Sequence, residues 1–301
     1  MNVRNWKRAA IALRFAAALI AAGAVSAAAV AAPPPARIAA LTAPSCQDKD
    51  VLAWRTAVLA ASGAVSGKQL AAECTLVTGL KTDGTWPSID RLWTYAAESS
   101  TQALIDLVAR ASATAVNSPT FTAARGFAGN GTSAYINSGY NASTAGGAYT
   151  LNAASFGCWI VIAEGSSGLP KYFLGNANTS GHRSFLRKGG TTAYEYGINY
   201  SGSATTFAQS SDTGLWMVQR TASSAMFLWQ NGVKVQTGGT SSSEGPDNAN
   251  LFSLATNDGA GTAVSPTTAQ LALCFAGGSL AGKEAAFYGR IRTYMTAMGV
   301  P

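Results

Sequence analysis

The pattern of hydrophobic and polar positions is clearest in the stretch LWMVQRTASSAMFLWQNGVKVQT, residues 215–237. Side chains of a strand alternate between two faces, so one face of its first run carries Trp216, Val218 and Arg220. Residues 221–224 are expected to form one turn. Asn231 and Gly232 form a second, because both residue types tolerate the positive φ of a type I′ turn. The stretch therefore predicts three consecutive antiparallel strands.

Other short β-prone runs flank this stretch and are separated by turn residues. They lie at 149–151, 157–163, 171–174, 184–187, 193–199 and 205–209 before it, and at 251–255 and 270–276 after it. About a dozen short strands with glycine-containing turns are typical of two packed sheets. We predict a mainly β fold, a two-sheet antiparallel jelly-roll sandwich over residues 120–301.

Helical spacing occurs at both ends of this region. Asp48 or Asp50 is expected to cap a helix that ends near Ala61, and Ser66 to cap a second helix over about 66–80. Residues 48–119 are therefore interpreted as a helical lead-in that caps the β body. From 280 to 298 the period is again helical, with the stripe Ala285, Tyr288, Ile291, Arg292 and Met295, which predicts a C-terminal helix against the sandwich.

The N-terminus has the order of a secretory signal peptide. Basic residues between Arg4 and Arg14 precede the apolar run 15–32, which ends in small residues. We expect a signal peptide over 1–31, with cleavage after Ala31 or Ala27, followed by a Pro-rich linker over 32–47. The alternative is an uncleaved anchor, since about eighteen apolar residues nearly span a bilayer. The protein is expected to be exported to the periplasm, cell surface or medium, or to be virion-associated.

The net charge of +7 belongs largely to this N-terminal segment. Its first fourteen residues hold the four cations Arg4, Lys7, Arg8 and Arg14, whose removal leaves about +3. The rest of the chain has no Lys/Arg cluster interleaved with aromatic residues, which argues against a nucleic-acid partner.

Four cysteines follow the signal segment, an even count that permits two disulfides in an exported chain. Cys46 and Cys74 bracket the first helix and make one natural pair, while Cys158 and Cys274 lie in two predicted strands and make the other. The alternative for the strand cysteines is a pair of buried free thiols. The sequence has one histidine, His182, and no Cys/His spacing of a zinc site.

Carboxylates after residue 120 are scattered. A glycoside hydrolase needs two carboxylates about 5 to 9 Å apart, and the alternating E-x-D-x-x-E strand of laminarinase-like enzymes is absent here. A remote pair such as Glu195 and Asp212 is the remaining way to assemble one. We therefore predict that the protein is not an enzyme.

Residues suited to a saccharide are more plentiful. Sugar faces stack on aromatic rings while amide and guanidinium groups bond their hydroxyls. The candidate ligand-binding residues are Tyr194, Tyr196, Tyr200, Trp216, Arg220, Trp229 and Asn231. The alternative is that these aromatic residues fill the core of the sandwich.

A weaker candidate concerns Ca²⁺, and no other cofactor is expected. The loop 245–261 holds oxygen ligands of the kind that Ca²⁺ accepts, namely Asp247, Asn248, Asn250, Asn257 and Asp258. Its spacing is not that of an EF-hand, and Asp and Asn at turns more often bond the local backbone.

Four segments together resemble a known family: 89–144, RTASSAMFLWQNG (220–232), NLFSLATNDGAGT (250–262) and LAGKEAAFYGRIRTYMTAMGV (280–300). The family comprises mostly uncharacterised phage and prophage proteins, tail or virion-associated, with a concanavalin-A-like or laminin-G-like jelly roll. The resemblance covers about 50–300. It implies a surface-exposed sandwich that binds carbohydrate or a cell surface, and it implies no catalytic residues. The signal-like N-terminus departs from the family and points to an exported relative.

The sequence thus predicts a non-catalytic module that binds a carbohydrate or cell-surface ligand and is prophage-derived. The sequence leaves open whether the chain forms a homo-oligomer or is part of a tail or virion assembly. The alternatives are a glycan-acting hydrolase of the same fold with an unconventional site, and a purely structural envelope or virion protein.

Overall fold

The computed structural model describes residues 46–301, except 166–167, 178–181, 203, 210 and 239–242. The described residues form one compact unit. The predicted signal peptide (1–31) and nearly all of the predicted linker (32–47) lie outside the described residues. Among the described residues, no helix is both long and apolar enough to cross a membrane.

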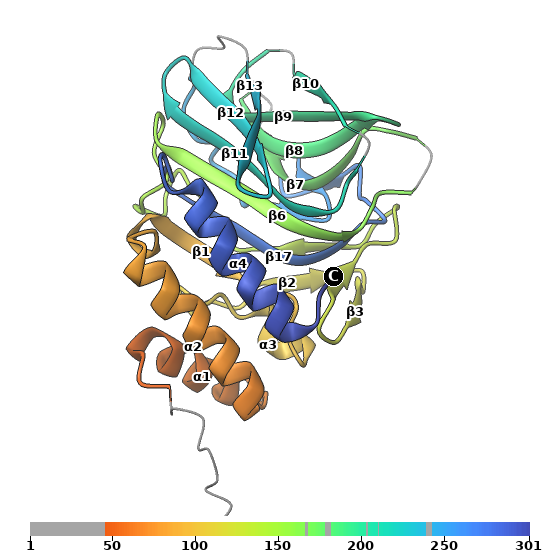
Figure 1. Cartoon of the computed structure of the whole chain (residues 1–301). Coiled ribbons are helices and arrows are strands. Elements are labelled where there is room, and N and C mark those ends of the chain that lie inside the picture. Colours follow the sequence, from red (N-terminus) through yellow and green to blue (C-terminus); the bar gives the residue numbers. More distant parts are fainter. Residues whose placement is uncertain (1–45, 166–167, 178–181, 203, 210, 239–242) are drawn as a thin grey trace, which may run out of the picture. The chain divides into compact units, whose positions relative to one another are not determined.

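Two sheets pack face to face (Figure 1). The first sheet has the strand order β13-β12-β11-β6-β17-β4-β3, and β1 also pairs with β17. Its strands are β1 (Ile89–Trp93), β3 (Thr120–Thr122), β4 (Gly126–Ala128), β6 (Ala154–Ile162), β11 (Gly214–Ala222), β12 (Ala225–Gln230), β13 (Val233–Thr237) and β17 (Gln270–Gly277). The predicted three-strand stretch is confirmed as β11–β13. Its second turn has φ of 51° at Asn231 and 76° at Gly232, as a type I′ turn requires.

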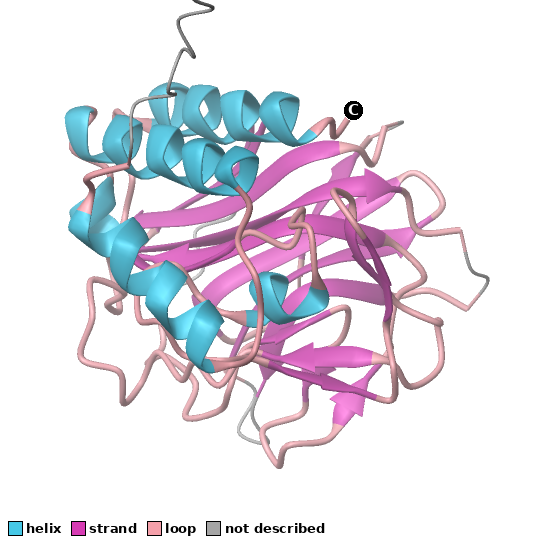
Figure 2. Cartoon of the chain, turned by 90° about the horizontal axis from the view of Figure 1, so that it is seen from below, coloured by secondary structure: helices cyan, strands magenta, loops and turns pink. Residues whose placement is uncertain are grey.

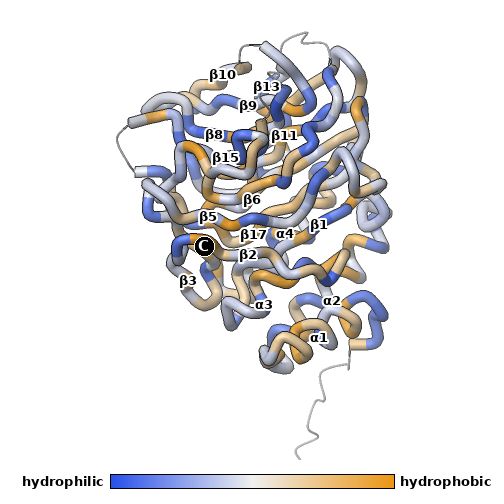
Figure 3. Tube along the Cα trace, turned by 180° about the vertical axis from the view of Figure 1, so that it is seen from behind, coloured by the Kyte–Doolittle hydropathy of each residue, from blue (hydrophilic) through white to orange (hydrophobic). Residues whose placement is uncertain are grey.

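The second sheet has the order β10-β9-β8-β7-β14-β5-β2, extended by β15 and β16. Its strands are β2 (Thr114–Val116), β5 (Tyr135–Asn137), β7 (Lys171–Ala177), β8 (Arg183–Gly190), β9 (Ala193–Tyr200), β10 (Thr205–Ala208), β14 (Phe252–Ser253), β15 (Thr256–Asn257) and β16 (Ala263–Val264). Figure 3 shows this sheet from behind, with hydrophobic and hydrophilic positions mixed along its strands. The predicted two-sheet antiparallel sandwich is confirmed. The run 149–151, expected as a strand, forms a turn instead.

The predicted helices are also present, and the longer ones gather on one side of the strands (Figure 2). They are α1 (Lys49–Ala60), α2 (Gly67–Thr82) and α4 (Glu284–Met298), with the shorter η1 (Trp86–Ser88) and α3 (Ser100–Leu104). Asp48 caps α1 by accepting from the Asp50 N–H, and Ser66 caps α2 by accepting from the Gln69 N–H. The range 48–119, interpreted as a helical cap, also contributes β1 and β2 to the sheets.

Two hydrophobic cores lie on the two faces of the first sheet. Along β6, Phe156, Cys158 and Ile160 point between the sheets. Trp159 points the other way, into the core shared with the helices. Because both faces of the central strands are buried, their sequences are nearly continuous apolar runs instead of alternating apolar and polar residues.

Both expected disulfides are present. Cys46 bonds to Cys74, which ties the start of the described chain to α2. Cys158 bonds to Cys274, which lies directly opposite on β17, inside the core between the sheets. The alternative of buried free thiols was therefore wrong. Two disulfides indicate a protein that folds in an oxidising, exported environment.

A buried carboxyl joins the helices to the sandwich. Glu73 of α2 is fully buried, and its Oε1 accepts from Gln69 Nε2 at 2.8 Å, Thr94 Oγ1 at 2.8 Å and the Tyr294 hydroxyl at 2.9 Å. Its Oε2 has no hydrogen-bond partner among the described residues. Burial raises the pKa of Glu73 from 4.5 to about 7, although its hydrogen bonds act in the opposite direction.

This carboxyl predicts a pH dependence of stability. Between pH 4.5 and about 7 the folded state holds a proton that the unfolded state has lost, so the free energy of unfolding falls as pH rises through this window. In Glu73→Gln the ionisable group is gone. We expect urea denaturation to show that the wild type loses about 2 to 3 kcal/mol more than the variant between pH 5 and pH 8.5.

Comparing the two proteins at each pH removes the contribution of Asp106, whose pKa burial also raises, to about 6. Parallel pH profiles for wild type and variant would contradict the prediction.

Candidate functional site

Most of the predicted ligand-binding aromatic residues belong to the core. Tyr194 stacks on Trp216 with ring centroids 4.2 Å apart and planes 12° apart, and both side chains are fully buried between the sheets. The Trp216 indole N–H donates to the Asp212 carbonyl at 2.9 Å. Tyr196 is buried in the same core. These three residues were wrongly predicted to face a ligand, because the period of two does not say which face of a strand is buried.

Tyr200 is also buried, but on the other face of β9. Alternation would place it with Tyr194 and Tyr196, yet the register shifts so that Phe185 pairs with Gly197 while Arg183 pairs with Tyr200. The segment between Gly197 and Tyr200 thus has one residue more than the opposing strand. Asn199 lies in it with a φ of 48°, so we interpret the segment as a β-bulge that turns Tyr200 to the face opposite Tyr194. A Cβ at Gly197 would lie 1.8 Å from the Tyr200 ring, which shows that the ring covers this glycine. The Arg183 guanidinium lies over the ring at 5.6 Å, and Tyr200 is not available to a ligand.

Arg220 connects the two sheets rather than binding a ligand. It is fully buried on β11, its Nε donates to the Ile198 carbonyl of β9 at 2.9 Å, and its Nη1 donates to the Ser223 carbonyl at 2.7 Å. Burial lowers its pKa from the ordinary value. The prediction of Arg220 as a ligand contact was wrong, because its guanidinium is used to satisfy strand-end carbonyls.

The last two candidates lie elsewhere. Trp229 is half-buried and packs in the core between the first sheet and the helices. Asn231 holds the β12–β13 turn: its backbone N–H donates to the Leu215 carbonyl at 2.8 Å, and its Oδ1 accepts from the Leu215 N–H at 2.9 Å. Of the seven predicted residues, Asn231 is the one that lines a pocket described below.

The candidate Ca²⁺ ligands are mostly used by local turns. Asn257 Oδ1 accepts from the N–H groups of Gly259 and Gly261, and Asp258 Oδ1 from those of Ala260 and Thr262. Asn248 bonds to Asn141, and Asn250 to Asn137. Asp247 is buried, and burial raises its pKa to about 6. The described residues contain no group of three or more His, Cys, Asp or Glu side chains that could hold a metal ion.

Three carboxylates of the sandwich, those of Glu164, Glu195 and Asp212, are engaged in structural contacts. Glu195 pairs with Arg187, and Asp212 pairs with Lys188 at 2.5 Å. Arg187 and Lys188 are consecutive on β8 and so point to opposite faces of the sheet. Glu195 and Asp212 are therefore not directed into one groove, as the remote catalytic pair would require. Glu164 accepts from the Thr268 N–H at 2.7 Å and Thr268 Oγ1 at 2.8 Å.

A pocket beside α4 combines aromatic, amide and guanidinium groups. Its volume is about 230 Å³, and it is lined by Trp159, Ile160, Val161, Thr213, Gly214, Asn231, Tyr288, Arg292 and Pro301. We call it the Trp159 pocket. The rings of Trp159 and Tyr288 are nearly parallel, with planes 4° apart and centroids 6.2 Å apart. The Arg292 guanidinium lies 5.7 Å from the Trp159 ring centroid.

Local chain geometry assembles this pocket from three elements. Trp159 comes from the outward face of β6, and Tyr288 and Arg292 lie one helical turn apart on α4. The Asn231 side chain fits against Gly214, where a Cβ would lie 2.4 Å from Asn231 Oδ1. Gly232 brings the turn against α4, since a Cβ there would lie 2.9 Å from the Tyr288 Cβ. Two glycines thus allow the turn to close one side of the pocket.

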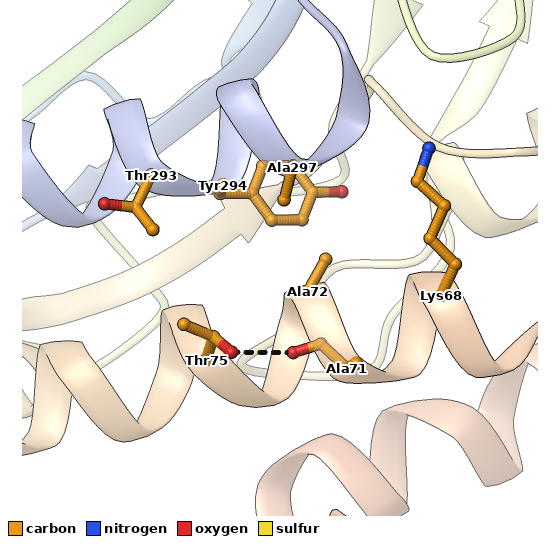
Figure 4. A pocket seen from close by; sticks show the side chains of 7 residues that line it. All are labelled: Lys68, Ala71, Ala72, Thr75, Thr293, Tyr294 and Ala297. Carbon is orange, nitrogen blue, oxygen red and sulfur yellow. Dashed lines mark hydrogen bonds between the residues drawn. The ribbon is translucent and has the colours of Figure 1, made fainter. Parts of the chain in front are cut away.

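A second pocket, of about 260 Å³, lies between α2 and α4 (Figure 4). Small side chains line it, among them Ala71, Ala72, Thr75 and Ala297, with Tyr294 and Lys68. The Tyr294 hydroxyl is bonded to Glu73 and to the Ala96 carbonyl, and Thr75 Oγ1 to the Ala71 carbonyl. With these groups occupied, the pocket offers a ligand little beyond apolar contact and the Lys68 ammonium.

Sequence reasoning missed Trp159, Tyr288 and Arg292 as site residues. Tyr288 and Arg292 were identified only as part of a helical stripe, and their spacing of four residues was the available signal. Nothing in the sequence brings that stripe to Trp159, which lies more than one hundred residues away in the chain.

The corrected positions predict different effects of two substitutions. Trp216→Ala removes a fully buried indole and is expected to cost about 3 to 5 kcal/mol of unfolding free energy in urea denaturation. Trp229→Ala, at a half-buried position, should cost less. If Trp216→Ala left stability unchanged, the assignment of Trp216 to the core would fail.

Comparison with known proteins gives information about the fold and about no other property. No family model matches the chain, and no curated protein matches it in sequence. Among solved structures, a mutant sialidase of Trypanosoma rangeli with trans-sialidase activity matches 75% of this chain and 39% of its own at 11% identity, with a TM-score of 0.50. The binding domain of botulinum neurotoxin serotype D matches 68% of this chain and 52% of its own at 12% identity, with a TM-score of 0.49. The chain thus spans about two-fifths of the sialidase, and the likeness to the sialidase shows a similar β-sandwich fold and no more.

Proposed function

We propose that the protein is a non-catalytic carbohydrate-binding module and that the Trp159 pocket is its binding site. The observation that carries this proposal is the meeting of two parallel aromatic rings, a guanidinium and an amide in one pocket. Saccharides are recognised by that combination, because their apolar ring faces pack on aromatic rings while their oxygens bond polar groups.

The size of the pocket limits how much of a ligand it holds. Pockets for drug-sized ligands are about 300 to 1,000 Å³, and the Trp159 pocket has about 230 Å³. It therefore suits a single sugar ring, such as the end of a chain. Ligands of this size usually bind weakly, so display of several copies or a longer glycan would be needed for firm attachment.

The absence of catalysis is part of the proposal. Glu195, Asp212 and Glu164 are held by Arg187, Lys188 and the Thr267–Thr268 segment, and no Asp or Glu side chain lines the Trp159 pocket. The sandwich shared with a sialidase supplies a scaffold on which binding and hydrolytic sites both occur. Origin from phage or prophage, and a role in a tail or virion, stay predictions from the sequence resemblance.

A glycan array probed with the full chain, made under oxidising conditions so that both disulfides form, tests this function. We expect binding to a subset of glycans, persistence of binding in EDTA, and no release of sugar from the bound glycans. Tyr288→Ala should weaken binding about tenfold, since an aromatic contact contributes about 1 kcal/mol or more beyond buried area.

Tyr172→Ala is the matched control, because Tyr172 is an equally half-buried aromatic residue on β7, away from the Trp159 pocket. Loss of binding in Tyr172→Ala but not in Tyr288→Ala would move the site to the second sheet. An array with no bound glycan would remove carbohydrate as the ligand class, and released sugar would show an enzyme.

A further inference from the structure

The side chains of Trp159, Asn231 and Arg292, which line the Trp159 pocket, carry N–H groups that donate hydrogen bonds. Trp159 is 2% exposed, and its indole N–H has no acceptor among the described residues. The Asn231 Oδ1 is taken by the Leu215 N–H, while no partner is found for its Nδ2 in the described part of the chain. The Asn231 amide therefore presents an N–H donor to the pocket, while the Trp159 N–H is enclosed.

Arg292 adds a third donor group. Its guanidinium lies over the Trp159 ring, the residue is exposed, and it forms no ion pair within the described residues. Its neighbour on the same helix, Arg290, is used differently: it donates from Nε and Nη2 to the two oxygens of Asp83, at 2.7 and 2.8 Å. Arg290 thus has a carboxylate partner, whereas none is found for Arg292 among the described residues.

Side chains that only accept hydrogen bonds are not found among the described residues that line this pocket. No Asp or Glu side chain lines it. The hydroxyls of Tyr288 and Thr213 can donate or accept. A ligand with several acceptor oxygens therefore complements the Asn231 amide and the Arg292 guanidinium.

We propose that the Trp159 pocket selects an acidic sugar, a pyranose that carries a carboxylate or a sulfate. This inference rests on the proposed function of the same pocket and names its ligand class. The anionic group pairs with the Arg292 guanidinium, whose planar fork bonds two oxygens of a carboxylate or sulfate at once. The sugar ring packs against the half-buried Tyr288, and its remaining oxygens accept from the Asn231 amide.

Matched ligands test the proposal by calorimetric titration of the full chain. Methyl glucuronide differs from methyl glucoside only in bearing a carboxylate, and glucose 6-sulfate is compared with glucose in the same way. We expect at least one acidic ligand to bind about tenfold to one-hundredfold more tightly than its neutral partner, as a charge-assisted bidentate pair implies. Which of the two does so distinguishes a carboxylate from a sulfate as the recognised group.

Substitutions then separate Arg292 from general charge. Arg292→Gln should reduce the acidic-over-neutral preference to less than about threefold, because glutamine has no charged fork to pair with the anionic group. Arg290→Gln, which removes the same charge from the same helix but not from the pocket, should keep the preference.

Equal binding of acidic and neutral sugars, or an equal loss of preference in both variants, overturns the inference and leaves carbohydrate binding intact. If no sugar binds, acidic or neutral, and the glycan array is also empty, the proposed function fails together with the inference.

Discussion

The pairing of β6 with β17 in the middle of the first sheet is the constraint on which the rest of the structure depends. Both faces of this pair are covered, one by the second sheet and one by the helices. Cys158 and Cys274 are opposite residues of the pair and are bonded on its inner face. Since a disulfide that closes a loop of 116 residues restricts the unfolded chain strongly, the bridge favours the register that all neighbouring strands follow.

The same pair links the core to the candidate site. Consecutive residues of β6 point to opposite faces, so that Cys158 is bonded inside the sandwich while Trp159 faces α4. The orientation of Trp159 is therefore as well determined as the register of the sheet. A rigid pocket wall favours weak saccharide binding, because little entropy is then lost on binding.

The protein contains two sets of aromatic residues with different roles. Tyr194, Tyr196 and Trp216 fill the space between the sheets, where stacking and burial stabilise the sandwich. Trp159 and Tyr288 meet on the opposite face of the first sheet, where the helix leaves a pocket. Both sets would look alike in a list of aromatic residues, and only the fold shows which of them border a pocket.

Much of the fold could be predicted because its signals are local. The Asn231-Gly232 turn, the caps at Asp48 and Ser66 and the alternation in β11 each depend on a few neighbouring residues, and all are present. The site could not be predicted in this way. Whether a face is buried depends on what packs on it, a bulge such as that at Asn199 reverses the alternation without a clear sequence mark, and the Trp159 pocket combines segments that only the folded chain brings together.

The measurement that tests the account most directly is the NMR spectrum of the tryptophan indole N–H groups during titration with methyl glucuronide and with glucose 6-sulfate, the Trp159 signal being assigned by its loss in Trp159→Phe. We predict that at least one of the two ligands shifts the Trp159 indole signal, because the ligand pairs with the Arg292 guanidinium that lies over this ring, while the Trp216 signal stays in place because Trp216 is buried between the sheets and its N–H bonds to Asp212. A bound ligand that leaves the Trp159 signal unchanged would contradict the account.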